Sequence, residues 1–405
     1  MRADVVILGG GLTGLACAKL LADQAAAGGR ALEIIVVDAA AAPTDIEVAA
    51  PLGLRVVALS PASLAVLGAC GAWPVALSGR VGHCRRMRVW QGEGDAAGAN
   101  AVGFDAAELG RTELMCVVEN DLLRSALWRA CGAPAGIRLL SGHAATAVAI
   151  TGTGVQITLD DGNAIETALV VGAEGHDSWL RRTLGVPVTD RDFGQTAIIA
   201  HVTGERPHGD TAWQRFLPDG PLALLPLGDG RSSIVWSAAT VRAAELMALP
   251  DADFDAALTA ASGGVRGALA LATSRHALPL AAHHASQYTG LRYALIGDAA
   301  HRIHPLAGQG ANLGLADAAA LAEAVATHVA KPGADPGDPL ALRRYERWRK
   351  AANLTTLSAM NAFHAVFTSR APGVAAAAGR MLGLVDRLAP VKRGLARQAM
   401  GVDGP

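Results

Sequence analysis

The sequence has few cysteines, and their spacing excludes the usual cysteine-based sites. The five cysteines form an odd set without a CxxC pair and without the His/Cys spacing of metal ligands. Neither a disulfide framework nor a zinc site is therefore indicated. The pattern fits a reducing cytoplasm, and we expect no bound metal.

An excess of charge of either sign is also missing. Lys and Arg number 35 against 36 Asp and Glu in 405 residues. No overall field therefore favours nucleic acid or an anionic surface. We expect a small partner that is uncharged overall, and no nucleic acid.

Long uninterrupted apolar runs are absent as well. Three consecutive glycines, residues 9–11, interrupt the apolar N-terminal stretch, which argues against a secretory leader. No uncharged apolar stretch of about 18 residues follows, so we expect no membrane-spanning helix. We expect a cytoplasmic protein, and peripheral contact with the inner face of the membrane is compatible with the sequence.

The chain opens with a pattern typical of nucleotide binding. Residues 5–8 predict a buried strand, residues 12–26 a helix and residues 32–37 a second strand. Gly9, Gly11 and Gly14 between them form GxGxxG, and the phosphates of a dinucleotide would lie at the helix N-terminus. Asp38 follows the second strand, where its carboxylate can accept hydrogen bonds from the adenosine ribose. The pattern predicts a dinucleotide but does not separate NAD from FAD.

A second informative segment covers residues 297–321, GDAAHRIHPLAGQGANLGLADAAAL. A strand predicted at residues 293–296 ends there and places Asp298 at the carboxyl edge of the sheet, where it could hold a ribityl hydroxyl. The loop that follows leads into a helix predicted from Ala311 to about residue 329. The N-terminus of that helix would stabilise negative charge near N1 and O2 of a flavin.

The rest of the chain differs in its pattern of apolar segments and turn residues. Residues 76–110 and 185–275 contain short apolar or alternating segments separated by turn signals, and we expect a β-rich substrate domain there. Residues 1–75, 111–184 and 276–340 would form a discontinuous, Rossmann-like FAD-binding domain. Residues 341–405 are expected to be a C-terminal helical region. The predicted fold is thus α/β, with a β-rich insert and C-terminal helices.

Several motifs resemble one family over nearly the whole chain. They include RVVALSPAS from Arg55, VVEN ending at Asn120, AWQRFLPDGPLALLPL from Ala212 and, most specifically, HPLAGQGANLG from His304. The sequence resembles the FAD-dependent hydroxylases of ubiquinone biosynthesis, a branch of the group A aromatic monooxygenases with the fold of para-hydroxybenzoate hydroxylase.

The resemblance implies a reaction and a set of cofactors. NAD(P)H or another donor would reduce FAD, and O2 would be activated as a flavin C4a-hydroperoxide that hydroxylates an electron-rich ring. The substrate would be a polyprenylated phenol or quinol of ubiquinone biosynthesis, and membership of a ubiquinone-biosynthesis complex is an expected partnership.

Motif and resemblance together give a set of expected FAD contacts. They are Gly9, Gly11, Leu12, Thr13, Gly14, Asp38, Arg55, Asn120, Glu174, Gly297, Asp298, Pro305, Gly308, Gln309, Gly310, Ala311 and Asn312. Glu174 departs from the family, which has Asp at this place. The departure puts the pyridine-nucleotide contact in doubt more than flavin binding, and a tolerated exchange in a structural turn is the alternative.

No residue is predicted with certainty to act as an acid or base. His304 and Pro305 are candidates that would line the space between flavin and substrate. His301 and His304 could serve as general bases, or could simply shape the loop. His283 and His284 are expected at the surface. Candidates for a hydrophobic substrate wall are Gln214, Phe216, Pro226 and Trp236, with ordinary sheet core as the alternative.

Three rival functions stay open at this point. One is a non-catalytic flavin-binding subunit of a quinone-biosynthesis complex. Another is an epoxidase or halogenase on the same fold, although the tryptophan-rich motif of halogenases is not seen. The last is an NAD-dependent dehydrogenase.

Overall fold

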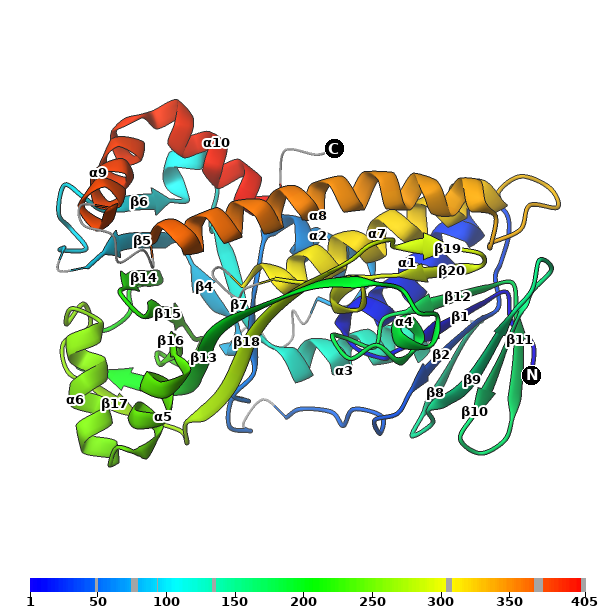
Figure 1. Cartoon of the computed structure of the whole chain (residues 1–405), viewed down its shortest axis with the longest axis horizontal. Coiled ribbons are helices and arrows are strands. Elements are labelled where there is room, and N and C mark those ends of the chain that lie inside the picture. Colours follow the sequence, from blue (N-terminus) through cyan, green and yellow to red (C-terminus); the bar gives the residue numbers. More distant parts are fainter. Residues whose placement is uncertain are drawn as a thin grey trace.

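The chain is built around a six-stranded sheet (Figure 1). The computed structural model describes residues 1–47, 50–73, 79–92, 94–132, 136–303, 308–367 and 374–401. Strand order in this sheet is β19-β20-β12-β1-β2-β8, parallel except for the β19–β20 pair. The strands are β1 (Val5–Leu8), β2 (Ile34–Asp38), β8 (Ile137–Ser141), β12 (Leu169–Gly172), β19 (Thr289–Gly290) and β20 (Tyr293–Leu295).

Helices cover this sheet because its central strands are apolar on both faces. All four residues of β1 are buried, as expected for a parallel sheet between helical layers. The predicted opening is confirmed, with a helix and β2 following β1. The predicted helix at 311–329 is also confirmed but begins two residues earlier. The helices are α1 (Leu12–Ala27), α2 (Pro61–Ala69), α3 (Asn120–Gly132), α4 (Trp179–Thr183), α7 (Gln309–Val329) and α8 (Pro339–Phe367).

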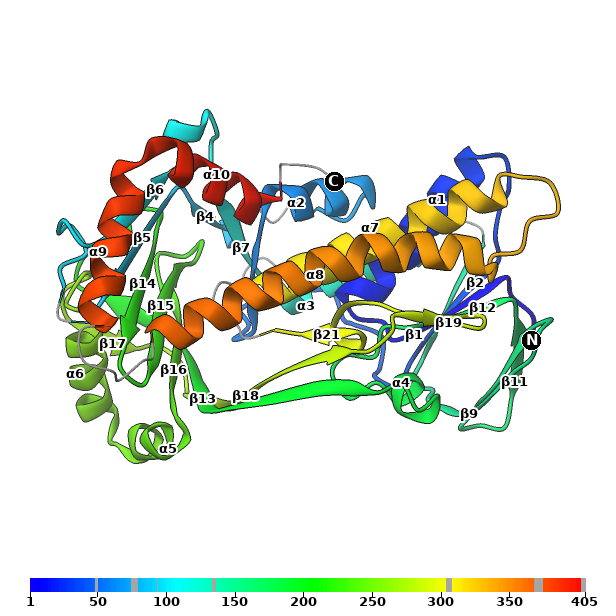
Figure 2. The ribbon, with the colours of Figure 1, turned by 45° about the horizontal axis from the view of Figure 1, so that its top comes forward.

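A larger, mainly antiparallel sheet lies beside the first (Figures 1 and 2). Its order is β21-β18-β13-β16-β15-β14-β5-β6, and β17 pairs with β13. Helices α5 (Thr240–Ala248) and α6 (Asp251–Ala261) pack on one face. The strands are β5 (Arg86–Gln91), β6 (Val102–Asp105), β13 (Val188–Gly204), β14 (Thr211–Leu217), β15 (Gly220–Pro226), β16 (Ser232–Ala239), β17 (Leu269–Leu271), β18 (His276–Ala285) and β21 (His301–Arg302).

Strands β13 and β18 are long and run from the larger sheet toward the parallel sheet (Figure 2). Strand β18 starts where the predicted FAD-binding part resumes, at residue 276, yet it pairs with β13 in the larger sheet. The predicted domain boundaries stay a prediction. The two long strands join the two parts of the fold through backbone hydrogen bonds as well as packing.

Two small sheets and two helices complete the chain. Strands β3 (Val56–Leu59), β7 (Met115–Glu119) and β4 (Gly82–Cys84) form one sheet, and β9 (Ala145–Ile150), β10 (Val155–Leu159) and β11 (Ala164–Thr167) form a meander. Helices α9 (Val374–Arg387) and α10 (Ala389–Met400) lie beside β5 and β6 (Figure 2). Within the described part of the chain, no helix has the length and apolar character needed to cross a membrane.

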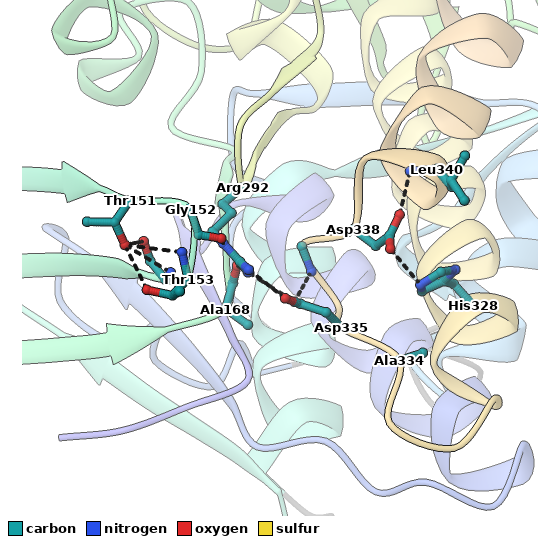
Figure 3. A network of polar contacts seen from close by, with 12 residues as sticks. Thr151, Gly152, Thr153, Ala168, Arg292, His328, Ala334, Asp335, Asp338 and Leu340 are labelled. Carbon is teal, nitrogen blue, oxygen red and sulfur yellow. Dashed lines mark hydrogen bonds and ion pairs between the residues drawn. The ribbon is translucent and has the colours of Figure 1, made fainter.

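A polar network closes the amino edge of the parallel sheet (Figure 3). Arg292 donates from Nε to the carbonyl of Gly152 at 3.0 Å, from Nη1 to the carbonyl of Ala168 at 2.9 Å, and to both carboxylate oxygens of Asp335. Burial alone would raise the pKa of Asp335, but the hydrogen bonds from Arg292 outweigh it and lower that pKa. The connection between α7 and α8 is thereby fixed to the amino edge of the sheet, opposite the carboxyl ends of its parallel strands.

Candidate functional site

One large cavity, of about 1690 Å³, opens at the carboxyl edge of the parallel sheet. It extends from the loop after β1 to the face of the larger sheet and on to helices α8, α9 and α10. Ligands of open α/β sheets bind at this edge, because the loops there are free to vary. The cavity is therefore the candidate functional site.

The glycine motif after β1 has three different spatial roles. A Cβ on Gly9, whose φ is +108°, would come within 2.4 Å of the carbonyl oxygen of Ala173, and one on Gly14 within 2.0 Å of the carbonyl oxygen of Gly9. A Cβ on Gly11 would meet nothing among the described residues within 4 Å, and Gly11 lines the cavity. Two glycines thus close the turn, and the third leaves a cradle for a phosphate group.

Asp38 lies at the end of β2 beside this turn. Its Oδ2 accepts from the Gly10 N–H at 2.7 Å, and its Oδ1 accepts from the Ala40 N–H at 2.8 Å. Arg124 on α3 donates from Nε to the Gly10 carbonyl at 2.9 Å and lies 3.4 Å from Asp38 Oδ2. Arg124 also lines the cavity. The sequence offered no signal for it, because a single arginine on an amphipathic helix is ordinary.

The second predicted motif comes to the same cavity. Gly297 follows β20 with a φ of +59°, and its N–H donates to Oδ2 of Asp317 at 3.0 Å. A Cβ at Gly297 would come within 3.0 Å of Thr13 Oγ1, so the loop packs directly on the start of α1. Asp298 lines the cavity beside Thr13, as predicted from its place at the strand end.

Two helix N-termini open into this one cavity. Helix α1 begins after Gly11 and helix α7 after Gly308, and no side chain among the described residues caps either one. The first turns of α1 and α7, both inside the described ranges, contain no acidic residue. N–H groups that have no partner within the helix, and a partial positive charge, therefore face the cavity at two places. The arrangement fits a dinucleotide with a negatively charged pyrophosphate and a second group that becomes negative on reduction.

The side-chain amide of Asn312, a predicted cofactor contact, forms its hydrogen bonds with other groups of the protein. Its Oδ1 accepts from the Ser60 N–H at 2.9 Å and from Ser63 Oγ at 2.7 Å, while its Nδ2 donates to the Ala58 carbonyl at 2.9 Å. The side chain lines the cavity but fixes the start of α2 to the first turn of α7. We infer that Asn312 positions the helix rather than holding the cofactor through its amide.

Arg55 and Asn120 also line the cavity, opposite the glycine turn. The Asn120 N–H donates to the Arg55 carbonyl at 2.9 Å. Behind them, Arg80 and Glu119 form a buried ion pair, with Arg80 Nη2 2.7 Å from Glu119 Oε1. That oxygen also accepts from the Gly53 N–H at 2.6 Å, so the segment that carries Arg55 is held in place.

Glu174 works as a brace for the turn after β12. Its Oε2 accepts from Ser178 Oγ at 2.5 Å, and its Oε1 accepts from the Leu180 N–H at 3.2 Å. Burial raises the pKa of Glu174, and these hydrogen bonds oppose the rise. Glu174 also lines the cavity. Its contacts are those expected for a tolerated exchange in a structural turn.

Of the two candidate bases, His301 is held by the protein's own contacts. His301 is buried, and its Nε2 lies 2.5 Å from Oδ2 of Asp317 on α7. His304 and Pro305, the candidates for lining the space between flavin and substrate, lie outside the described residues. The expectation that His283 and His284 are surface residues is wrong: both are buried on β18, and His283 Nε2 donates to the Asp298 carbonyl at 2.8 Å. Both faces of this end of β18 are covered, so the two adjacent histidines are buried together.

The four candidates for a substrate wall lie on two different faces of the larger sheet. Gln214 and Phe216 on β14 line the cavity. Trp236 on β16 points to the other face, where it packs with Phe254, and Pro226 likewise follows the cavity-lining Leu225 by one residue. Successive side chains of a strand face opposite sides, so neighbours along β15 and β16 cannot share the wall.

The wall of the larger sheet is mostly apolar. The row Val89, Gln214, Ala223, Val235 and Ile199 crosses five neighbouring strands in register, and every member lines the cavity. Gln214 is its one polar member. A carboxamide in an apolar wall can orient a ring by hydrogen bonding to an oxygen substituent.

Comparisons with known proteins agree with this geometry. The profile of a protein family described as an FAD binding domain matches residues 2–356. The chain is 36% identical to the ubiquinone hydroxylase UbiL of Rhodospirillum rubrum over 98% of this chain and 90% of that protein. It is 33% identical to the 3-demethoxyubiquinol 3-hydroxylase of Escherichia coli, over 98% of each chain. It is also 33% identical to the human ubiquinone biosynthesis monooxygenase COQ6, over 91% of this chain and 86% of that protein.

Solved structures share the fold. The p-nitrophenol 4-monooxygenase PnpA of Pseudomonas putida superposes with a TM-score of 0.75 at 18% identity, covering 98% of both chains. HpxO of Klebsiella pneumoniae, solved with FAD and uric acid, gives a TM-score of 0.70 at 18% identity, covering 98% of this chain and 97% of that one. At these identities the likeness concerns the fold alone, and it confirms the predicted α/β architecture.

The glycine turn gives a first test. In Gly14→Ala, the new Cβ would meet the Gly9 carbonyl oxygen at 2.0 Å, and the turn must open. We expect bound flavin to fall from about one per chain to below roughly a tenth, because the phosphate cradle depends on this close packing. Visible absorbance of the purified protein measures it. Gly68→Ala on α2, where a Cβ meets nothing within 4 Å, should retain flavin; equal flavin content in the two variants would contradict the assignment.

A second test concerns pH and His284. Its Nε2 accepts from Tyr288 Oη at 3.0 Å, and burial lowers the pKa of His284 from 6.5 to about 4. Between these two values the unfolded chain binds a proton that the folded chain does not, so the free energy of unfolding must decrease as pH falls from 6.5 to 4. One such proton contributes up to about 1.4 kcal/mol per pH unit.

Urea titrations between pH 7 and pH 4 would measure this slope. We expect His284→Gln to show a shallower loss of stability than the wild type, and His176→Gln, a change at an exposed histidine, to keep the wild-type slope. Parallel curves for His284→Gln and the wild type would show that His284 does not cause the loss.

Proposed function

This chain belongs to the FAD binding domain family and is an FAD-dependent monooxygenase, and from that membership we propose that it hydroxylates the aromatic ring of a ubiquinone precursor. The choice of pathway rests on the relatives, which are named for ubiquinone hydroxylation or ubiquinone biosynthesis. One observation in the structure supports the choice of substrate: the cavity joins the dinucleotide cradle to an apolar wall that carries a single carboxamide. An aromatic ring with oxygen substituents and an apolar tail suits that surface.

The residues that would hold FAD follow from the geometry. The glycine turn and the N-terminus of α1 would bind the pyrophosphate, and Asp38 with Arg124 would face the adenosine end. Asp298 would face the ribityl chain, and the first turn of α7, Gly308 to Asn312, would lie near the flavin ring. When bound, FAD supplies the redox chemistry, taking electrons from NAD(P)H or another donor and passing one oxygen atom of O2 to the ring.

The protein itself contributes positioning, charge stabilisation and exclusion of water. The N-terminus of α7 places N–H donors and the positive end of the helix dipole where negative charge develops, and its backbone does not need to reorganise during the reaction. The apolar row on the larger sheet keeps water from the reacting centre. Gln214 fixes the ring in that row through a hydrogen bond to a ring oxygen. No protein nucleophile is needed for this chemistry.

The substrate's tail has a route through the same cavity. From Phe216 the lining continues over Val102 and Phe104 on β6 to Met360 and Phe363 on α8. These side chains are apolar, so a polyprenyl chain would leave water on entering. The ring would then lie at the sheet wall while the tail points to the C-terminal helices.

Isotope labelling tests the proposed function. FAD-loaded protein, NADPH or NADH, and a phenol with a geranyl tail would be incubated under ¹⁸O2, and the products analysed by mass spectrometry. We expect one ¹⁸O atom on the ring, the second oxygen atom appearing as water and two electrons drawn from the donor. A non-catalytic subunit would give no product, and an epoxidase would place ¹⁸O on the tail. A saturated decyl tail should therefore leave hydroxylation unchanged.

Gln214 gives a sharper test of ring recognition. In Gln214→Leu the wall becomes wholly apolar, and we expect kcat/KM to fall about 10- to 30-fold, as for a lost hydrogen bond to a reacting substrate. Product formed per NAD(P)H consumed should fall as well, since the ring is held less firmly. Flavin content should not change. Gln156→Leu, on the exposed face of β10, is the matched control; if both variants behave alike, Gln214 does not orient the ring.

A further inference from the structure

The last part of α8 and the two C-terminal helices, with the residue that joins them, expose an unusual share of the large apolar side chains. Of the twelve large apolar side chains exposed in the described chain, six lie within 33 residues near the C-terminus. These six are Phe363, Met381, Leu384, Leu388, Val391 and Leu395. Single exposed apolar residues are ordinary, but a contiguous group marks an interaction surface. We call this group the apolar stripe.

Packing within the chain does not explain the apolar stripe. The inner side of α9, with Ala378 and Leu382, already packs on Val89, Val102 and Phe216, and the inner side of α10, with Ala396 and Met400, packs on Ala106 and Leu114. Polar contacts fix the pair further, since Asp386 Oδ1 accepts from the Gly103 N–H at 3.0 Å and from Lys392 Nζ at 3.2 Å. The outer residues therefore form a second apolar face that the described chain leaves open.

The spacing along the two helices keeps the stripe together. Met381 and Leu384 are three residues apart on α9, and Val391 and Leu395 are four apart on α10, which are the spacings of neighbours on a helix surface. Leu388 lies at the joint between the two helices. Figure 2 shows α10 following α9 at the end of the molecule that carries β5 and β6, and the two helices contact each other. The residues of the apolar stripe on α9 and α10 therefore lie at this end of the protein.

Charge in this region differs from that of the whole chain. Residues 374–401 contain four arginines and one lysine against a single acid, Asp386, whereas the whole chain has a net charge of −1. Arg380, Arg387, Arg393 and Arg397 are exposed. Asp386 is already bonded to Lys392. Exposed arginines on the two helices that carry most of the apolar stripe make this end of the protein complementary to a surface with an apolar interior and negative headgroups.

The same helices form a mouth of the cavity. Phe363, Met381 and Leu395 both line the cavity and are exposed at the surface. Met360, Leu382 and Val385 continue the lining inward, toward Phe216 on the sheet wall. The apolar stripe is therefore continuous with the apolar route to the ring site.

We propose that α9 and α10 dock this protein on an anionic lipid bilayer, with the apolar stripe in the interface and the cavity mouth against the lipid. A polyprenyl tail would then pass from the bilayer into the cavity between α8 and the α9–α10 pair without crossing water. The part played by the tail rests on the proposed function, whereas the docking itself does not. The arginines beside the stripe would contact lipid phosphates, and a bilayer is the single occupant that satisfies the stripe, the charge and the mouth together.

Vesicle flotation tests the docking. FAD-loaded protein would be mixed with one of two kinds of vesicle. The first is phosphatidylcholine with about 30% phosphatidylglycerol, an anionic lipid, and the second is phosphatidylcholine alone. We expect flotation with the anionic vesicles and at least roughly 10-fold weaker binding to the neutral ones. Absence of flotation with anionic vesicles would overturn the proposal, and equal binding to both would overturn the role of the arginines.

Surface variants locate the docking face. Leu384→Glu with Leu388→Glu should reduce binding to anionic vesicles at least about 10-fold, because two charged groups replace apolar contacts in the interface. Arg387→Ser with Arg393→Ser should reduce it by roughly 5-fold for each charge. Val241→Glu on α5 and Arg138→Ser on β8 change equally exposed residues far from the stripe and should bind like the wild type. Wild-type binding by the Leu384/Leu388 variant would overturn the assignment of this face.

Activity separates this proposal from the proposed function. The Leu384/Leu388 variant should hydroxylate a tail-less phenol in solution as fast as the wild type, but should turn over a long-tailed phenol embedded in vesicles more slowly. If the wild type floats yet hydroxylates neither phenol, the docking stands and the proposed function fails. If it hydroxylates the tail-less phenol but does not float, the proposed function stands and the docking fails.

Discussion

The buried carboxylate of Asp317 is the contact on which the site depends. Its side chain has no exposure, and its two oxygens accept from the Gly297 N–H, His301, Arg349 and Asn353. Burial alone would raise the pKa of Asp317, but the charged and hydrogen-bonded partners outweigh it and keep the group ionised. Because the partners come from β21, α8 and the turn after β20, one residue ties α7 to three other elements. Removing one partner would leave a buried charge unpaired, which is far more costly than losing an exposed ion pair.

This anchor relates the two ends of the cavity to each other. The contacts of Asp317 fix the position of α7 relative to the turn that carries Asp298. They also hold Arg349 in the middle of α8, and the far end of α8 carries Met360 and Phe363. A single rigid helix therefore connects the cofactor edge to the mouth at α9 and α10. The ring wall reaches the same cavity by a different route, through the long paired strands β13 and β18. The distance between cradle, wall and mouth is thus determined by regular secondary structure rather than by loops, which is the arrangement that keeps reacting groups in place.

The sequence predicted those features whose cause is local. Gly9 is required by its positive φ and Gly14 by its contact with the Gly9 carbonyl, both within the turn, and Asp298 is placed by its position after a strand. Their places could therefore be inferred before any tertiary contact was known. The role of Asp317 could not, because its partners lie 16, 20, 32 and 36 residues away and the residue looks like any acid on a helix. The same holds for Arg124. Among the candidates on the larger sheet, the sequence alone makes Gln214 and Trp236 equally plausible members of the substrate wall. Only the register between β14, β15 and β16 shows which of them faces the cavity and which faces the core.

Both cofactor-facing helices start without a capping side chain, which has an energetic consequence. An N-cap side chain typically contributes about 1 kcal/mol to a helix, and α1 and α7 each forgo that contribution from the described residues. An anionic group that lies against these helix ends accepts hydrogen bonds from their N–H groups, so donors that receive no side-chain cap from the described residues in the free protein strengthen its complex. Binding to the folded state alone stabilises it by RT ln(1 + [L]/Kd), about 2.7 kcal/mol at a ligand concentration 100 times Kd. The cofactor would therefore complete the packing of the sheet edge as well as supply the chemistry. Because the Gly9 turn, Asp317 and the N-termini of α1 and α7 form one connected site, the stability of the protein and its activity are linked.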